Sequence, residues 1–144
     1  MSRLKKVIRN IIWTIRRVAG IDTLILLSAR TAALQNRDIK TLNSLADVEF
    51  RAFSQWGEVG IIDWLVELVQ PEAKTFLEFG VEDYRESNTR YLLIAGNWQG
   101  LVIDGDPSNL ATIRNDDISY KYAINSVASF ITAENIRSLM DDAQ

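Results

Sequence analysis

The sequence predicts an α/β fold with a parallel sheet, and three observations support this prediction. After Pro71, short apolar segments alternate with segments of helical character, and the joints between them are short. This alternation is typical of βαβ units with right-handed crossovers. The residues before Pro71 have the periodicity and composition of helices. The length of 144 residues, with 47% apolar and 24% charged residues, suits one globular domain.

A basic amphipathic helix is expected over residues 1–20. At 100° per residue, seven aliphatic side chains fall on one face and six cations fall on the other. The aliphatic residues are Leu4, Val7, Ile8, Ile11, Ile12, Ile15 and Val18, and the cations are Arg3, Lys5, Lys6, Arg9, Arg16 and Arg17. The arginines interrupt the apolar residues, so neither a signal peptide nor a spanning helix is predicted. Two interpretations remain open: attachment to an anionic membrane surface, or packing on the domain or on a partner chain.

Further helices are expected before the sheet begins. Residues 21–50 favour one or two helices, with Asp22 as N-cap. Another helix is expected over residues 60–69, and Pro71 follows its end. Its inward-facing residues are expected to be Ile61, Ile62, Leu65, Leu68 and Val69. We therefore divide the chain into an N-terminal helical segment, residues 1–45, and an α/β domain, residues 46–144.

Three strands and three helices are expected after Pro71. The strands are predicted at residues 74–80, 101–104 and 119–125. One helix is predicted at residues 87–95. A second begins after the Asp106 cap, with Pro107 in its first position, and a third runs from Thr132 to residue 142.

The composition excludes several kinds of chemistry. The chain has no cysteine and no histidine, which excludes disulfides, thiolate or imidazole metal sites, and histidine as a general base. We expect no metal, and a reducing, cytoplasmic environment. Subtracting the six cations of residues 1–20 from the 16 Lys and Arg leaves 10 cations against 19 acids, a net charge of −9 for the rest of the chain. No nucleic-acid partner is therefore expected.

The segment TFLEFGVEDYRESNTR, residues 75–90, has the position of a nucleotide-binding loop. In open α/β sheets ligands bind at the carboxyl ends of the strands, and an acidic residue at the end of the second strand commonly holds ribose hydroxyls. Asp104 stands there, 24 residues after Gly80. A GxGxxG fingerprint is absent, and the acidic Glu82 would repel a pyrophosphate. S-adenosylmethionine has no phosphate and two positive centres, so an acidic loop suits it.

Four segments resemble the N-terminal half of FkbM-like methyltransferases. They are SQWGEVGIIDWL (54–65), FLEFGVEDYRESNTRYLL (76–93), NWQGLVIDGD (97–106) and SFITAENI (129–136), and the resemblance covers roughly residues 45–144. It implies a Rossmann-like class I fold, S-adenosylmethionine as cofactor, and methyl transfer to an oxygen or nitrogen of a small molecule or glycan. It also implies cofactor contacts by Glu78, Gly80 and Asp104, and by Ser54 and Gln55 in the entry segment. It identifies no catalytic residue.

The chain departs from the family pattern in two ways. Val59 replaces an acidic residue of the family's SQxGEDG, and the sheet has only about three strands. We therefore expect either a fragment or a sheet completed by another chain, as in an oligomer. Each site residue also has a structural explanation: Gly80 as a turn, Asp104 as part of a capping turn and Glu78 as an edge-strand carboxylate. The alternative function is a non-catalytic scaffold relative, peripheral at the inner membrane surface or bound to a partner through residues 1–20.

Overall fold

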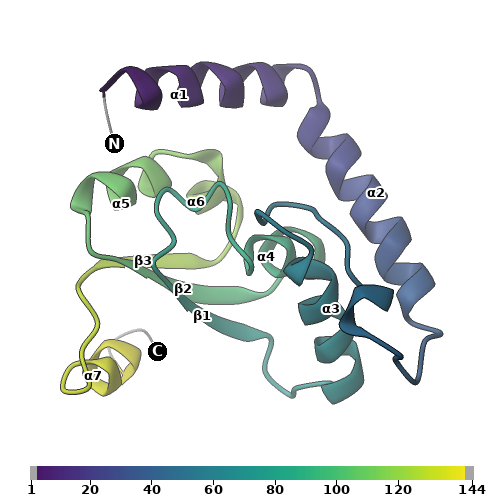
Figure 1. The fold of residues 1–144 in the computed structure, drawn as a ribbon. Coiled ribbons are helices and arrows are strands. Elements are labelled where there is room, and N and C mark those ends of the chain that lie inside the picture. The colour runs from purple at the N-terminus through teal and green to yellow at the C-terminus, as the bar shows by residue number, and fades with distance from the viewer. Residues whose placement is uncertain (1–2, 142–144) are drawn as a thin grey trace.

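The computed structural model describes residues 3–141 and has the expected α/β architecture (Figure 1). Three parallel strands lie in the order β1-β2-β3: β1 (Thr75–Phe79), β2 (Gln99–Asp104) and β3 (Ile124–Ala128). Phe76 is in register with Gly100, and Gly100 with Ile124. The fold is compatible with a Rossmann-like sheet. The predicted helix ends at residues 1–2 and 142 lie outside the described residues.

One face of the sheet carries the main core. The helices α4 (Arg90–Gly96), α5 (Pro107–Arg114) and α6 (Asp117–Lys121) lie over this face, and α7 (Ile136–Asp141) lies on the other side (Figure 1). Val102 of β2 packs there with Leu93 of α4 and with Leu110 and Ile113 of α5. All four side chains are almost fully buried, so these contacts fix the two crossover helices on the sheet.

A second cluster joins the N-terminal helices to the domain. Ala29 of α2 (Ile21–Asn36) packs with Phe53, with Tyr91 of α4 and with Val59 of α3 (Glu58–Val69). Val59, the residue that departs from the family pattern, is only 1% exposed. An apolar side chain therefore suits this position as a core residue, and a carboxylate there would be desolvated.

Four details of the predicted elements were wrong, in addition to shifts of two or three residues at the starts of β2, α3 and α4. Residues 119–121 belong to α6, because the Asp116 side chain accepts the Ile118 N–H and starts a helix, and β3 begins only at Ile124. The last helix begins at Ile136, after a turn in which Asn135 accepts the Thr132 N–H. The N-cap of α2 is Gly20, and Asp22 lies in the first turn.

The fourth error concerns the inward face of α3. Leu65, Leu68 and Val69 are exposed, because α3 packs against α2 and meets the core through its N-terminal Val59 and Gly60. A Cβ on Gly60 would lie 2.2 Å from the Val48 carbonyl oxygen, so only glycine permits this close approach of the chain.

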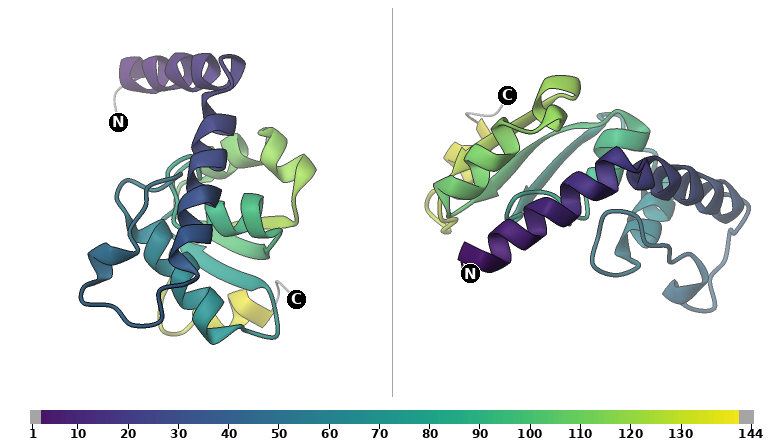
Figure 2. Two further views of the ribbon diagram at one scale, coloured as in Figure 1. Left: turned by 90° about the vertical axis from the view of Figure 1, so that its right-hand side faces the viewer. Right: turned by 90° about the horizontal axis from the view of Figure 1, so that it is seen from above.

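The first helix, α1 (Arg3–Val18), lies along the top of the molecule in Figure 1 and in the left-hand view of Figure 2. It crosses the top of the domain, and α2 turns down beside α3 and α4 after Gly20, which has a φ of 70°. Its polar face is turned toward the domain, and its aliphatic face is turned away. The helix therefore packs on the domain, but it does so through its polar face and not through its aliphatic face.

Candidate functional site

The candidate site lies where β1 and β2 end and the segments 80–89 and 104–106 form adjacent loops. Gly80 has a φ of 72°, and a Cβ there would meet nothing within 4 Å, so the position needs glycine for its backbone conformation alone. Glu82 and Tyr84 also have positive φ values, 47° and 60°. Such a conformation costs about 1 kcal/mol or more for a non-glycine residue. The surrounding contacts must therefore hold this loop in place.

Asp104 supplies much of that support. It lies at the end of β2, as predicted, and is 8% exposed. Its Oδ2 accepts the Glu82 N–H at 2.9 Å, while its Oδ1 accepts the Asp106 N–H at 2.9 Å and the Asn109 amide at 3.0 Å. Both carboxylate oxygens are therefore bonded within the chain, and they tie the loop after β1 to the loop after β2.

Glu78 holds the other end of the same loop. Its carboxylate accepts the N–H groups of Asn88, at 3.1 Å, and Thr89, at 3.0 Å, and the hydroxyls of Ser87 and Thr89. The Thr89 side chain makes no capping bond of its own, so Glu78 of β1 accepts the free N–H groups at the start of α4. These contacts agree with a structural role, and a contact of Glu78 with a cofactor stays a prediction.

Ser54 and Gln55 lie in different surroundings. Ser54 is buried, and its hydroxyl donates to the Trp56 carbonyl at 2.6 Å. Gln55 is exposed and lines a cavity of about 220 Å³ together with Gly80. Of the five predicted site residues, the structure brings Gly80 and Gln55 together in this cavity, and Ser54, Glu78 and Asp104 do not line it.

The cavity is closed on one side by α1. The Arg9 guanidinium bridges the loop, with Nη1 at 3.0 Å from a Glu82 oxygen and Nη2 at 2.9 Å from an Asp83 oxygen. Trp13 also lines the cavity. This contribution of α1 was not predicted from the sequence. The available signal was the position of Trp13 among the cations, opposite the aliphatic face.

Trp13 is buried among guanidinium groups. The Cζ atoms of Arg16, Arg85 and Arg90 lie 5.1, 5.2 and 5.3 Å from its ring centroid. Burial lowers the pKa of Arg90, whose Nη1 donates to the Tyr84 carbonyl at 2.8 Å. The carboxylates of the loop after β1 are therefore partly neutralised within the chain, since Arg9 and Arg85 both pair with Asp83.

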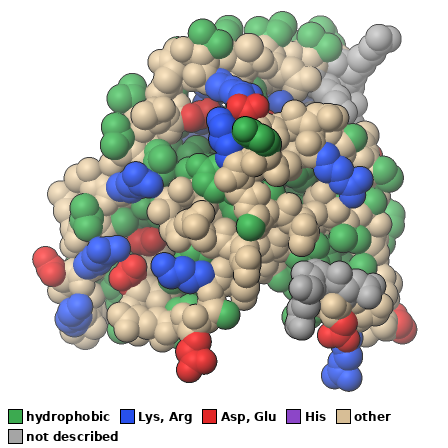
Figure 3. All heavy atoms as spheres, turned by 180° about the vertical axis from the view of Figure 1, so that it is seen from behind, with side chains coloured by type: hydrophobic (Ala, Val, Ile, Leu, Met, Phe, Trp, Pro, Cys, Tyr) green, Lys and Arg blue, Asp and Glu red, His purple; other side chains and the backbone are tan. Residues whose placement is uncertain are grey.

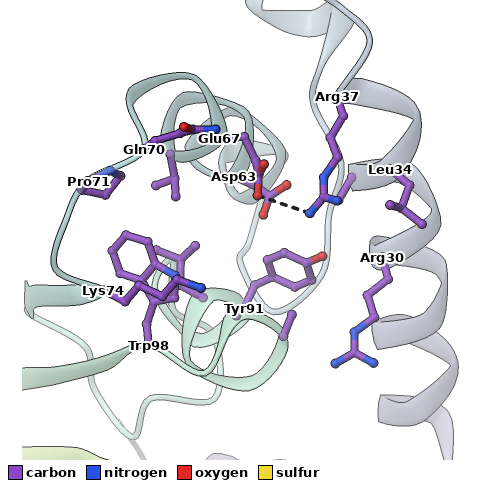
Figure 4. A pocket seen from close by; sticks show the side chains of 15 residues that line it. Arg30, Leu34, Arg37, Asp63, Glu67, Gln70, Pro71, Lys74, Tyr91 and Trp98 are labelled. Atoms are coloured by element: carbon purple, nitrogen blue, oxygen red, sulfur yellow. Dashed lines mark hydrogen bonds and ion pairs between the residues drawn. The ribbon is translucent and has the colours of Figure 1, made fainter.

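A second cavity, of about 500 Å³, lies between α2, α3 and α4 (Figure 4). Lys74 and Trp98 line it, and these residues precede β1 and β2, so it lies at the opposite end of the strands from the predicted site. Burial, with Glu67 nearby, raises the pKa of Asp63 to about 6, and Arg37 opposes this shift. Burial also raises the pKa of Tyr91 to about 12. This cavity was not predicted from the sequence.

The described residues contain neither a carboxylate cluster for a metal ion nor a helix that could cross a membrane. Within residues 3–141, no cluster of three or more carboxylates is arranged to hold a metal ion. Over the same residues, no helix combines the length and the apolar character needed to cross a membrane. Comparison with known proteins adds no relative: no family model, no curated protein and no solved structure matches the chain.

Proposed function

We propose that this chain is a methyltransferase-like protein that binds S-adenosylmethionine where β1 and β2 end. The observation that carries the proposal is the acidic loop after β1. Arg9, Arg16 and Arg85 line the cavity beside Gly80 as well, and Glu82, Asp83 and Glu86 give it a wall of three carboxylates. Such a wall suits a ligand with an ammonium and a sulfonium and repels the phosphates of a dinucleotide. The resemblance of residues 45–144 to FkbM-like methyltransferases supports the same reaction, methyl transfer to an oxygen or nitrogen of a small molecule or glycan.

The described residues fit this cofactor only if α1 moves. The cavity of about 220 Å³ is below the roughly 300–1,000 Å³ typical of ligand pockets. Arg9 and Trp13 form its α1 side, and both Asp104 oxygens are bonded within the chain. In the proposed binding state, the Arg9 contacts with Glu82 and Asp83 open and the loop carboxylates face the cofactor. The bound cofactor would supply an electrophilic methyl group, and the chain would contribute orientation rather than a histidine base.

Calorimetric titration with S-adenosylhomocysteine tests the proposal. We expect Asp104→Ala to weaken binding by about 1–3 kcal/mol, because it removes the charged acceptor that holds the Glu82 N–H in the loop after β1. Asp106→Ala is the matched control, because it removes a carboxylate two residues away that caps α5. Arg9→Ala should tighten binding, since it removes the pairs that close the cavity. Circular dichroism must show that all variants are folded.

A second candidate function is a non-catalytic scaffold relative. It is favoured by the internal bonding of Glu78 and Asp104 and by the closure of the cavity by Arg9. The same titration separates the two functions. Absence of S-adenosylhomocysteine binding by both the folded wild type and the folded Arg9→Ala variant would refute the methyltransferase proposal and support the scaffold function.

A further inference from the structure

The outward face of α1 is a row of exposed apolar side chains. Seven aliphatic side chains on this helix are each between 48% and 84% exposed: Leu4, Val7, Ile8, Ile11, Ile12, Ile15 and Val18. Seen from behind, hydrophobic side chains stand along the top edge of the molecule (Figure 3). A continuous row of this kind is unusual on a monomeric protein and marks an interaction site.

The orientation of α1 is fixed by contacts on its opposite face. Arg9 pairs with Glu82 and Asp83, and the Asn10 side chain accepts a hydrogen bond from Arg85 at 2.7 Å. Arg17 forms an ion pair with Asp117. At 100° per residue, the buried Trp13 lies opposite the centre of the aliphatic face. The aliphatic face therefore cannot turn inward without breaking these contacts.

The spacing of the exposed side chains suits another helix. Leu4, Ile8, Ile11, Ile15 and Val18 are separated by four, three, four and three residues. This is the spacing of the a and d positions that pack between paired helices. Read from the other end, the spacing is three, four, three and four, so in an antiparallel pair the a positions of one copy face the d positions of the other, and Ile11 lies near the middle of the row. Two copies of α1 can therefore lie antiparallel about a two-fold axis near Ile11, and each copy then offers the other the same surface.

The charges on α1 favour a protein partner over a lipid surface. Arg9, Arg16 and Arg17 are paired with carboxylates of the chain, so these charges are already compensated. Trp13, the aromatic residue of this helix, is turned inward instead of toward a membrane interface.

We propose that the aliphatic face of α1 binds the α1 of a second copy of this chain, antiparallel, with Ile11 near the two-fold axis. A 16-residue helix is about 24 Å long. One such face is smaller than the roughly 800 Å² per partner of a standard interface, so we expect a weak dimer. This inference does not depend on the proposed methyltransferase function.

Sedimentation equilibrium over a range of concentrations tests the proposal with the full chain. The wild type should approach twice its 16.3 kDa mass at high micromolar concentration. Ile11→Glu places two like charges close to the symmetry axis and should raise the dissociation constant at least about 100-fold. Leu68→Glu is the matched control, because Leu68 is 59% exposed on α3 and Ile11 is 53% exposed on α1. Circular dichroism reports whether each variant is folded.

Each outcome decides the question. Dimerisation that Ile11→Glu abolishes and Leu68→Glu preserves supports the proposal. A wild type that stays monomeric at every concentration overturns it, and so does a dimer that a folded Ile11→Glu variant retains. Co-sedimentation with phosphatidylcholine vesicles, without and with phosphatidylserine, adds a second arm. A monomer that binds these vesicles through Ile11 would overturn the proposal in favour of a lipid surface.

Discussion

Replacing Asp63 by asparagine should stabilise the protein at neutral pH. Burial raises the pKa of Asp63 from 3.8 to about 6. A carboxyl with a higher pKa in the folded state binds more protons when folded, so its contribution is most favourable below pH 4 and is lost as the pH rises through 6. Two pKa units correspond to about 3 kcal/mol. Because Asp63 is partly exposed, we reduce this to about 1–2 kcal/mol.

Urea unfolding of the wild type and Asp63→Asn at several pH values measures this effect. Asparagine keeps the shape of the side chain but cannot ionise, so the stability gain should be full at pH 7–8 and should shrink between pH 6 and pH 4. Asp38→Asn, at an exposed position after α2, is the control and should change stability by less than about 0.5 kcal/mol. A gain that does not vary with pH, or an NMR titration of Asp63 near pH 4, would refute the reasoning.

Two further predictions concern the loop after β1 and its neighbouring strands. Glu78→Gln should lower the free energy of unfolding by about 1–2 kcal/mol, because it weakens the hydrogen bonds to the N–H groups at the start of α4. Glu72→Gln, at an exposed position, should have little effect. Equal effects of the two substitutions in urea unfolding would contradict the capping role of Glu78. Gly80→Ala should cost about 1 kcal/mol through its positive φ alone. Gly100→Ala should lower the free energy of unfolding more than Gly80→Ala, since its Cβ would lie 2.5 Å from the Phe76 ring. Thermal unfolding that ranks the two variants in the opposite order would contradict the packing described for the sheet.

The sequence identified most of the elements because their signals are local. Alternation of apolar and helical segments predicted β1, β2 and the helices between them, and Asp106 with Pro107 predicted the start of α5. The third strand was displaced because its aromatic and β-branched residues favour a strand, while the Asp116 cap, a stronger local signal, starts a helix at Asp117. At the candidate site, the place of Asp104 at the end of β2 was predictable from chain order. The bonding of its two oxygens was not, because it depends on how two loops meet.

The sequence by itself determined that α1 has one aliphatic and one basic face, since this follows from the period of 3.6 residues. Only the tertiary structure decided which face meets the domain. The deciding groups are far away in the chain: Glu82 and Asp83 attract Arg9, and Asp117 attracts Arg17. The loop that contains Glu82 and Asp83 is in turn held by Asp104. A helical period cannot encode such contacts, because they arise only when the sheet brings distant residues together.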